Sequence, residues 1–304
     1  MLNKALVTGG CGFIGSTLVD ELIRLNFDVT VIDNLSADCH DQPYYNSKAL
    51  YAKSDISDYK LIEPLFDGVS YVFHLAAEAR IQPTIADPCL AIKTNVLGTC
   101  NVLQAARQHK VTRVMFSSTS AAYGLKNSGP LKETMERDCL NPYSVSKCSG
   151  EDLCKMYSSV FGLETIIFRY FNVFGDRQPT KGQYAPVVGL FQKQYAEGVP
   201  MTVVGDGLQT RDYVHVSDVV NANVKAICAH KSLAGEIFNV GTGRSYSVLD
   251  LVYMIGGDTP SFMHMPARIG ESKDTLADCT KISKALSWYP QTKIEDFIRS
   301  KQKV

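Results

Sequence analysis

Apolar runs and amphipathic stretches alternate along the first half of the chain. Short apolar runs predict buried strands at 5–7, 29–32, 71–77, 114–119 and 165–170. Helical periodicity follows the first run and recurs around 89–109 and 143–161. This alternation predicts an α/β fold of the Rossmann type, a doubly wound parallel sheet with helices on both faces. We therefore expect ligands at the carboxyl ends of the strands.

The pattern changes after about residue 175. Glycine, proline and glutamine become frequent over 175–186, and short apolar segments follow at 201–204, 213–216 and 236–240. A helix expected around Met254 would be cut short by Gly256 and Gly257. We expect a nucleotide-binding Rossmann domain over 1–175. A smaller α/β substrate-binding domain would occupy mainly 176–304, with segments that cross back to the first.

The first strand leads into a glycine-rich turn that opens a helix. Gly9 permits the tight turn, Gly12 lets a pyrophosphate approach the backbone, and Gly15 lets helix and strand pack closely. An ordinary glycine-rich turn is the alternative, because this spacing alone is a weak signal. The second strand ends at Asp33, whose carboxylate would bind the ribose hydroxyls and repel a 2′-phosphate. Together these features predict NAD rather than NADP.

Composition narrows the class of protein. The 304 residues include 31 basic and 31 acidic side chains, which gives no electrostatic reason to expect nucleic acid or an acidic membrane surface. No run has the length of a transmembrane helix, and the first residues lead straight into a strand, so we expect no signal peptide. The nine cysteines are dispersed without a Cys-x-x-Cys pair, which predicts reduced thiols in the cytoplasm and no metal site.

Tyr143 and Lys147 open the helix near 143, and their spacing of four places both side chains on one helical face. A free tyrosine, with a pKa of about 10, is a poor base at neutral pH. A neighbouring ammonium and a cationic nicotinamide would lower that pKa. Tyr143 could then take a proton from a sugar hydroxyl while hydride leaves the same carbon for NAD, and Lys147 could also hold the nicotinamide ribose. An exposed Tyr/Lys pair is the alternative.

Thr119 closes the strand before Tyr123-Gly124, where its hydroxyl could orient the reacting oxygen. Capping of the strand end by this hydroxyl is the alternative.

The chain resembles the extended short-chain dehydrogenase/reductases and, within them, the NAD-dependent nucleotide-sugar epimerase/dehydratase family. The resemblance extends over nearly the whole chain. It is carried by the motifs 8–15 (TGGCGFIG), 33–36 (DNLS), 55–56 (DI), 74–77 (HLAA), 94–99 (TNVLGT), 117–119 (SST), 141–147 (NPYSVSK), 169–175 (RYFNVFG) and 211–219 (RDYVHVSDV).

The resemblance implies roles for individual residues. Asp55 and Ile56 would hold the adenine, and Asn95 would line the cofactor cleft. Thr119, Tyr143 and Lys147 would be catalytic. The cofactor site would comprise Gly9, Gly12, Phe13, Ile14, Gly15, Asp33, Asn34, Ser36, Asp55, Ile56, Leu75, Ala76, Ala77, Asn95, Ser117, Tyr143, Lys147 and Tyr170. The substrate site would comprise Arg80, Thr119, Ser120, Asn172, Pro186, Val187, Thr202, Val204, Arg211, Arg268, Glu271 and Thr275.

Arg211 and Arg268 would pair with the phosphates of the substrate, and Glu271 would bind the nucleotide ribose. The residues at 183–187 would wrap the nucleotide. A surface ion pair between Arg211 and Asp212 is the alternative for that arginine.

In the dehydratases of the family that this chain resembles, Asp-Glu directly follows the active-site threonine. This chain has Ser120-Ala121 at that place. We therefore expect a 4-epimerase that oxidises C4 of a UDP-hexose and returns hydride to the opposite face. A net reductase or dehydrogenase, a decarboxylase and a non-catalytic NAD-binding module are the other hypotheses. The intact Thr119, Tyr143 and Lys147 argue against the last, and the lack of a carboxylate beside Thr119 argues against a decarboxylase.

Thr275 matches the position that limits the 2-substituent of the sugar in such epimerases. Because threonine is small, UDP-GlcNAc/UDP-GalNAc is favoured, with UDP-Glc/UDP-Gal also open. Arg80 stands where comparable epimerases carry smaller residues. It could contact a uronic acid, which keeps UDP-glucuronate 4-epimerisation open, or face solvent or a partner subunit.

The helices near 89–109 and 143–161 carry apolar stripes that include Leu97, Val102, Leu103, Met156 and Val160. In the family the matching helices form a four-helix bundle across a two-fold axis, so a homodimer is expected. Burial of both stripes in the core is the alternative.

Overall fold

The centre of the molecule is a seven-stranded parallel sheet. The computed structural model describes residues 3–37, 43–180, 185–270 and 272–302. The strands lie in the order β10-β6-β5-β4-β1-β2-β3, and every neighbouring pair is parallel. Their bounds are β1 (Lys4–Thr8), β2 (Asp28–Asp33), β3 (Leu50–Lys53), β4 (Tyr71–His74), β5 (Arg113–Thr119), β6 (Glu164–Tyr170) and β10 (Glu236–Val240). The predicted Rossmann-type fold is confirmed.

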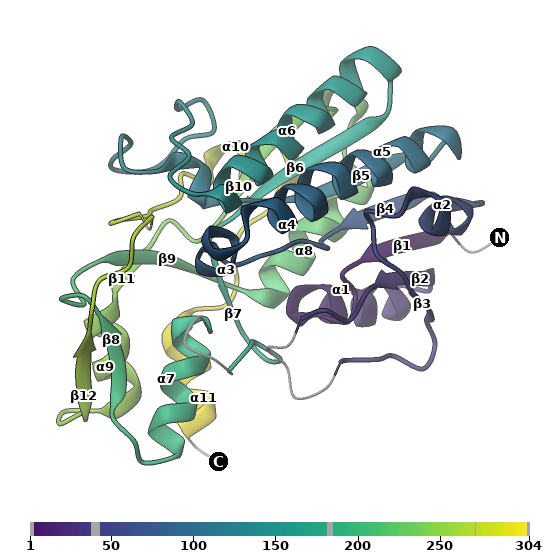
Figure 1. The fold of residues 1–304 in the computed structure, drawn as a ribbon. Coiled ribbons are helices and arrows are strands. Elements are labelled where there is room, and N and C mark those ends of the chain that lie inside the picture. The colour runs from purple at the N-terminus through teal and green to yellow at the C-terminus, as the bar shows by residue number, and fades with distance from the viewer. Residues whose placement is uncertain (1–2, 38–42, 181–184, 271, 303–304) are drawn as a thin grey trace.

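Helices cover both faces of this sheet (Figure 1). Alternate residues of β1 point to opposite sides, so Ala5 and Val7 join one core cluster and Leu6 joins the other. The first cluster is closed by α1 (Phe13–Arg24), α8 (Val216–Ile227) and α10 (Thr280–Leu286). The second is closed by α2 (Tyr59–Ile62), η1 (Glu63–Phe66), α5 (Thr99–Gln108) and α6 (Pro142–Phe161).

A smaller lobe lies beside the carboxyl ends of the large sheet, at the lower left of Figure 1. Its core packs Phe174, Phe191, Leu251 and Phe297 together. Its sheets are β11-β9-β7 and β12-β8. Its elements are β7 (Asn172–Phe174), α7 (Val187–Ala196), β8 (Met201–Val204), β9 (Thr210–His215), β11 (Ser245–Ser247), α9 (Val248–Gly256), β12 (Phe262–Met265) and α11 (Ile294–Gln302). Helix α9 ends at Gly256, before Gly257 at φ 72°, as expected.

Segments beyond residue 175 also pack on the large sheet, among them α8 and α10 on one face and β10 at its edge. The short 3₁₀ turn η4 (Lys231–Leu233) precedes β10. Within the part of the chain that the structure describes, no helix is long and apolar enough to cross a membrane.

Two predicted elements differ in extent from those observed. The strand predicted at 71–77 ends at His74, because the amides of Leu75 and Ala76 bond the Thr8 hydroxyl, each at 3.2 Å. The helix predicted over 89–109 is interrupted. It consists of α4 (Pro88–Ile92), the π-helical turn η2 (Lys93–Gly98) and α5, after a separate short helix α3 (Ile81–Ala86). Such π turns occur frequently at functional sites.

Helix α6 has strong local signals at both ends. The Asn141 side chain accepts a bond from Ser144 N at 2.8 Å, and Pro142 occupies the first turn. These are favoured positions for a helix start. Gly162, in the left-handed conformation at φ 71°, ends it. The helix that carries Tyr143 and Lys147 therefore begins at a defined residue.

Candidate functional site

A cavity of about 670 Å³ opens at the carboxyl ends of the strands, between the large sheet and the smaller lobe. The chain runs from β1 to β2 and β3 on one side of the sheet and then to β4 on the other, which makes a topological switch point between β1 and β4. The lining includes the glycine turn after β1 and the segment after β4. The predicted site and the observed cavity therefore coincide in position.

The glycine turn is shaped by close backbone contacts. A Cβ on Gly9, at φ 71°, would lie 2.8 Å from Ala76 N, and one on Gly15 would lie 2.1 Å from Gly9 O. At Gly12 a Cβ would meet only Gly9 O at 3.5 Å, so protein packing does not require glycine there. No side chain caps the start of α1, which leaves its backbone amides to an anion. These features fit a dinucleotide whose pyrophosphate takes the place of a side chain at Gly12.

Asp33 lies at the end of β2 against this turn. Its carboxylate accepts bonds from Cys11 N at 2.9 Å and from Leu35 N at 2.8 Å, which orient it into the cavity lining. Asn34 bonds Asp55 at 3.1 Å. Asp55 itself stands behind the wall, while its neighbour Ile56 lines the cavity. The remaining cofactor candidates that line it are Phe13, Ile14, Asn34, Ser36, Leu75, Ala76, Ala77, Ser117 and Tyr170.

The three candidate catalytic residues meet in this cavity. Thr119 is the last residue of β5, and Tyr143 and Lys147 lie in the first two turns of α6. The Lys147 ammonium lies 4.9 Å from the centre of the Phe116 ring. Burial lowers the pKa of Lys147 to about 8, partly offset by the negative charge of Glu151. The lysine is therefore mainly charged at neutral pH, but its charged fraction is smaller than that of an exposed lysine.

The pKa of Tyr143 departs from the expectation. Burial raises it above the ordinary value, and the Thr119 hydroxyl opposes that rise. We expect the Lys147 ammonium and a cationic nicotinamide together to lower it. The protein's own groups do not supply that lowering, because removal of the phenol from water outweighs them. A bound nicotinamide would add its positive charge to that of Lys147 in stabilising the phenolate.

Asn95 lies behind the cavity wall, in η2, with 1% of its surface exposed. Its side chain donates to Ser146 Oγ at 2.9 Å and Glu78 O at 3.0 Å, and accepts from Glu78 N at 2.8 Å. Ser146 in turn donates to Tyr143 O at 2.8 Å. Asn95 therefore joins the segment after β4 to the start of α6, in place of the expected direct position in the cofactor cleft.

A buried histidine supports the same region. The Thr99 hydroxyl donates to Asn95 O at 2.6 Å, so it accepts from His74 Nε2 at 2.9 Å. Thr8 accepts from two backbone amides and so donates to His74 Nδ1 at 2.7 Å. These bonds assign the Nε2–H tautomer. Burial lowers the pKa of His74 to about 3, and the charge of Lys147 adds to this.

The substrate candidates divide into two groups. The following line the cavity: Arg80, Thr119, Ser120, Asn172, Pro186, Val187, Arg211, Arg268 and Thr275. Thr202 and Val204 lie outside its lining, on β8, and Thr202 bonds Gln194 at 3.0 Å. Glu271 and residues 183–184 lie outside the described residues.

Arg211 and Asp212 point in different directions. The Arg211 guanidinium donates to the carbonyls of Lys273 and Ser272, each at 2.6 Å. Asp212 is fully buried and accepts bonds from Thr242, Gly243 and Ala277. The alternative of a surface ion pair between these neighbours therefore does not describe this arginine.

Two carboxylates near the site were not anticipated. Glu78 lines the cavity directly after Ala77, and its position at a strand end is the signal that could have identified it. Glu151 is fully buried, four residues after Lys147. It accepts from Ser118 Oγ at 2.6 Å and pairs with Arg169 at 2.7 Å. Its spacing from Lys147 marks the same helical face, but only the structure reveals its partners.

Comparison with known proteins agrees with this geometry. Residues 5–241 match the NAD dependent epimerase/dehydratase family. The chain belongs to this family. The UDP-glucose 4-epimerase of Mycolicibacterium smegmatis is 34% identical over 305 residues, covering 97% of this chain and 96% of that protein.

Two solved structures are similar along their whole length. One is UDP-glucose 4-epimerase of Thermotoga maritima with UDP-glucose, at a TM-score of 0.91 and 35% identity, covering 97% of this chain and 96% of that one. The other is UDP-N-acetylglucosamine 4-epimerase of Methanobrevibacter ruminantium with UDP-N-acetylmuramic acid, at a TM-score of 0.90 and 32% identity, covering 100% and 98%. The predicted family, the NAD cofactor and an NAD-dependent epimerase are confirmed.

Proposed function

We propose that this enzyme is a UDP-hexose 4-epimerase acting on UDP-GlcNAc/UDP-GalNAc or UDP-Glc/UDP-Gal in the cytoplasm. The observation that carries the proposal is the meeting of Thr119, Tyr143 and Lys147 in one cavity with the glycine turn. Ser120 and Ala121 follow Thr119, so no acid–base pair for water loss adjoins it. The names of the similar proteins support the same reaction.

Each residue would have a distinct role. The hydroxyl of Thr119 orients the C4 oxygen, and Tyr143 Oη takes its proton and later returns one. The Lys147 ammonium, held in a dry environment, stabilises the phenolate and binds the nicotinamide ribose. NAD, when bound beside the glycine turn, would supply the hydride chemistry at C4. Between the two transfers the 4-keto sugar must turn over within the cavity.

The cavity-lining residues of the smaller lobe would bind the nucleotide. Arg211 and Arg268 face the cavity and suit a diphosphate, since planar guanidinium groups bind phosphate oxygens well. Asn172, Pro186 and Val187 extend this lining. Glu271 would bind the nucleotide ribose.

The test is conversion of each UDP-sugar by the purified holoenzyme without added cofactor. We expect products of unchanged mass and inverted C4, followed by mass spectrometry and NMR. Loss of water or carbon dioxide would refute the proposal. Stoichiometric formation of reduced cofactor, followed by its absorbance, would instead identify a net reductase or dehydrogenase.

UDP-glucuronate 4-epimerisation is a second candidate, and Arg80 favours it. Arg80 lines the cavity, and its Nη2 atom is buried without a hydrogen-bond partner among the described residues. An unpaired buried donor is costly and is readily satisfied by a carboxylate. If Arg80 binds the uronate, Arg80→Gln raises KM for UDP-glucuronate far more than for UDP-glucose. Equal changes for both sugars would exclude this role.

Assembly as a homodimer through η2, α5 and α6 is also part of the proposal. The two predicted stripes separate into distinct environments. Val102 and Leu103 are in the core, whereas Leu97, Val160 and the neighbouring Phe161 are exposed. An exposed apolar strip on adjacent helices fits pairing with a second copy into a four-helix bundle.

A further inference from the structure

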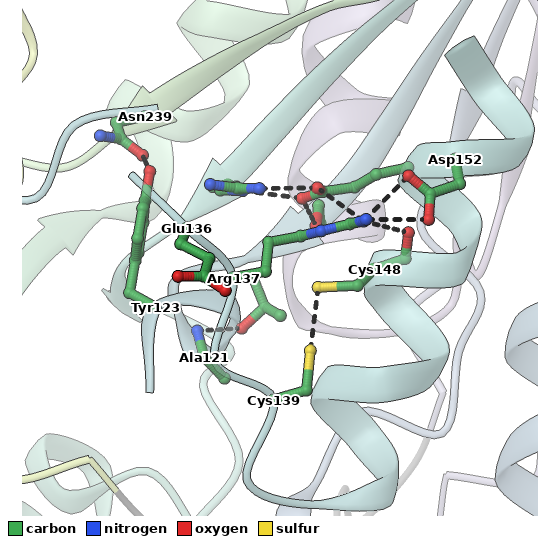
Figure 2. A network of polar contacts seen from close by, with 12 residues as sticks. Ala121, Tyr123, Glu136, Arg137, Cys139, Cys148, Asp152 and Asn239 are labelled. Atoms are coloured by element: carbon green, nitrogen blue, oxygen red, sulfur yellow. Dashed lines mark hydrogen bonds and ion pairs between the residues drawn. The ribbon is translucent and has the colours of Figure 1, made fainter. Parts of the chain in front are cut away.

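Two cysteines at the start of α6 lie against each other, and neither lines the cavity. The Sγ atoms of Cys139 and Cys148 are 3.4 Å apart, in hydrogen-bond contact (Figure 2). Both are free thiols. Cys139 precedes the helix and is half-buried, whereas Cys148 lies in its second turn and is 5% exposed. The pair is therefore within reach of bond formation, and Cys139 is the more exposed of the two residues.

The surroundings make the two thiols unequal. The hydrogen bond with Cys148 lowers the pKa of Cys139 to about 7, with help from Ser144 and the charge of Arg137, against burial and Glu151. The hydrogen bond to Cys139, together with burial, raises the pKa of Cys148. A large fraction of Cys139 is therefore thiolate at neutral pH, and thiolate is the form that reacts with oxidants. Cys139 suits the attacking position and Cys148 the resolving one.

Arg137 holds the local framework around these sulfurs. Its guanidinium donates to Cys148 O at 3.0 Å and to Asp152 at 2.9 and 3.0 Å (Figure 2). It also lies 4.0 Å from Glu151. The carbonyl and carboxylates keep the cation beside the pair, where it favours a thiolate.

The pair brackets both candidate catalytic residues of α6. Cys139 lies two residues before the capping Asn141, and Cys148 directly follows Lys147. Asn141 also donates to Gly270 O at 2.7 Å, which connects the helix start to the segment after Arg268. A disulfide requires an S–S distance of about 2.05 Å, so its sulfurs must approach by more than 1 Å. We expect closure of the bond to shift the backbone at this helix start and, with it, Tyr143 and Lys147.

We propose that Cys139 and Cys148 form a reversible oxidation site for hydrogen peroxide whose disulfide lowers turnover by displacing the first turns of α6. The Cys139 thiolate attacks one peroxide oxygen, the O–O bond breaks, and the departing hydroxide takes a proton to form water. The Cys148 sulfur then attacks the sulfenic sulfur, the S–O bond breaks, and hydroxide leaves with the Cys148 proton as a second water. Two thiols thereby supply the two electrons that reduce one peroxide, and a thiol reductant reverses the change.

The chemical test uses the full-length holoenzyme, treated with hydrogen peroxide and then alkylated and digested. Trypsin cuts after Arg137, Lys147 and Lys155, so the disulfide would join peptide 138–147 to peptide 148–155. Fragment spectra distinguish Cys148 from Cys154 in the second peptide. We expect the cross-link in the unaltered protein and its absence in Cys139→Ser and Cys148→Ser. Absence of the cross-link in the unaltered protein would overturn the proposal.

The functional test measures epimerase turnover before and after peroxide. Because misplacement by about 1 Å can cost ~100-fold, we expect at least a ~10-fold fall in kcat, restored by dithiothreitol. Cys139→Ser should retain basal turnover and resist peroxide, while Cys89→Ser, at an exposed cysteine elsewhere, should respond as the unaltered protein does. A complete cross-link with unchanged turnover would overturn the regulatory role.

The readout of turnover rests on the proposed function, whereas the cross-link does not. If no UDP-sugar is converted, the function proposal fails. The oxidation site is then judged by the cross-link and by the fluorescence of NADH added as the reduced form of the cofactor. Formation of the cross-link with altered cofactor fluorescence would still support it, and its absence would still overturn it.

Discussion

At the scale of single residues, the site depends on groups whose protonation is set by burial. Burial raises the pKa of Tyr143 and lowers those of Lys147 and His74. The three groups therefore carry less charge than they would in water. Such a dry environment strengthens the electrostatic interaction between these groups and the charge of a bound cofactor.

Replacing the candidate base removes the proton transfer. We expect Tyr143→Phe to lower kcat by about 10²–10⁴-fold, because general acid–base catalysis contributes that much. Binding of NAD and the melting temperature should change little. Tyr157→Phe is the matched control on the same helix, since Tyr157 bonds Gln104 and lies outside the cavity lining. Unchanged turnover of Tyr143→Phe would contradict the mechanism.

The residue at the proposed sugar gate decides which 2-substituent fits. Thr275 is 6% exposed, lines the cavity and receives a bond from Asp212 N at 3.4 Å. Thr275→Tyr should suppress turnover of UDP-GlcNAc more than that of UDP-glucose, because the ring would occupy the space of the N-acetyl group. Initial rates with both sugars test this. Equal suppression would rule out the gate.

His74 makes stability depend on pH. Its folded pKa of about 3 lies below the ordinary value of 6.5. As pH falls below the ordinary value, the unfolded chain binds a proton that the folded chain does not. Stability is therefore lost by up to about 1.4 kcal/mol per pH unit.

We expect this loss between about pH 6.5 and 3 in urea unfolding, and a shallower pH dependence in His74→Gln. His264→Gln, at an exposed histidine, is the control. Identical pH profiles for the unaltered protein and His74→Gln would show that His74 does not control this loss.

At the scale of elements, helix α6 is held against two strands by one carboxylate. Glu151 bonds Ser118 of β5 and pairs with Arg169 of β6. Ser118 adjoins Thr119, so this network sets the distance between the strand end and the helix that share the chemistry. The capping Asn141 and the oxidisable Cys139–Cys148 pair act on the same helix from its start.

Glu151→Gln should destabilise the protein by roughly 3–5 kcal/mol, because it leaves the Arg169 charge buried without its counterion. Asp152→Asn, at the exposed neighbouring position, should cost less than about 1 kcal/mol. Chemical denaturation of both variants provides the comparison. Similar losses of stability in the two variants would show that the buried ion pair contributes no more than the exposed one.

At the scale of the whole molecule, the two lobes line the cavity of the site, and η2 and α6 present exposed apolar side chains. Val160 of α6 is 64% exposed. If two copies pair there, Val160→Asp yields a monomer with unchanged far-ultraviolet circular dichroism, measured by light scattering. Leu208→Asp, which changes an exposed leucine of the smaller lobe, should leave the assembly intact. A protein that is monomeric before any substitution would remove the basis for this interface.

Local patterns in the sequence were enough to predict the Rossmann-type sheet, the glycine turn, Asp33 at a strand end and the Tyr143/Lys147 spacing. Each depends on residues a few positions apart, whose geometry follows from helix and strand periodicity. The interruption of the helix over 89–109 by a π turn was not predictable in this way. Periodicity alone does not distinguish a π turn from an α-helix.

Only the tertiary structure decided which distant segments meet. In the folded protein Asn95 lies behind the cavity wall, and Thr202 and Val204 lie outside the cavity lining. The fold also brings the thiols of Cys139 and Cys148 into contact. Burial also raises the pKa of Tyr143, an effect that the spacing of Tyr143 and Lys147 does not reveal. The reason is that burial and hydrogen bonding depend on everything packed around a group, and most of those neighbours are far away along the chain.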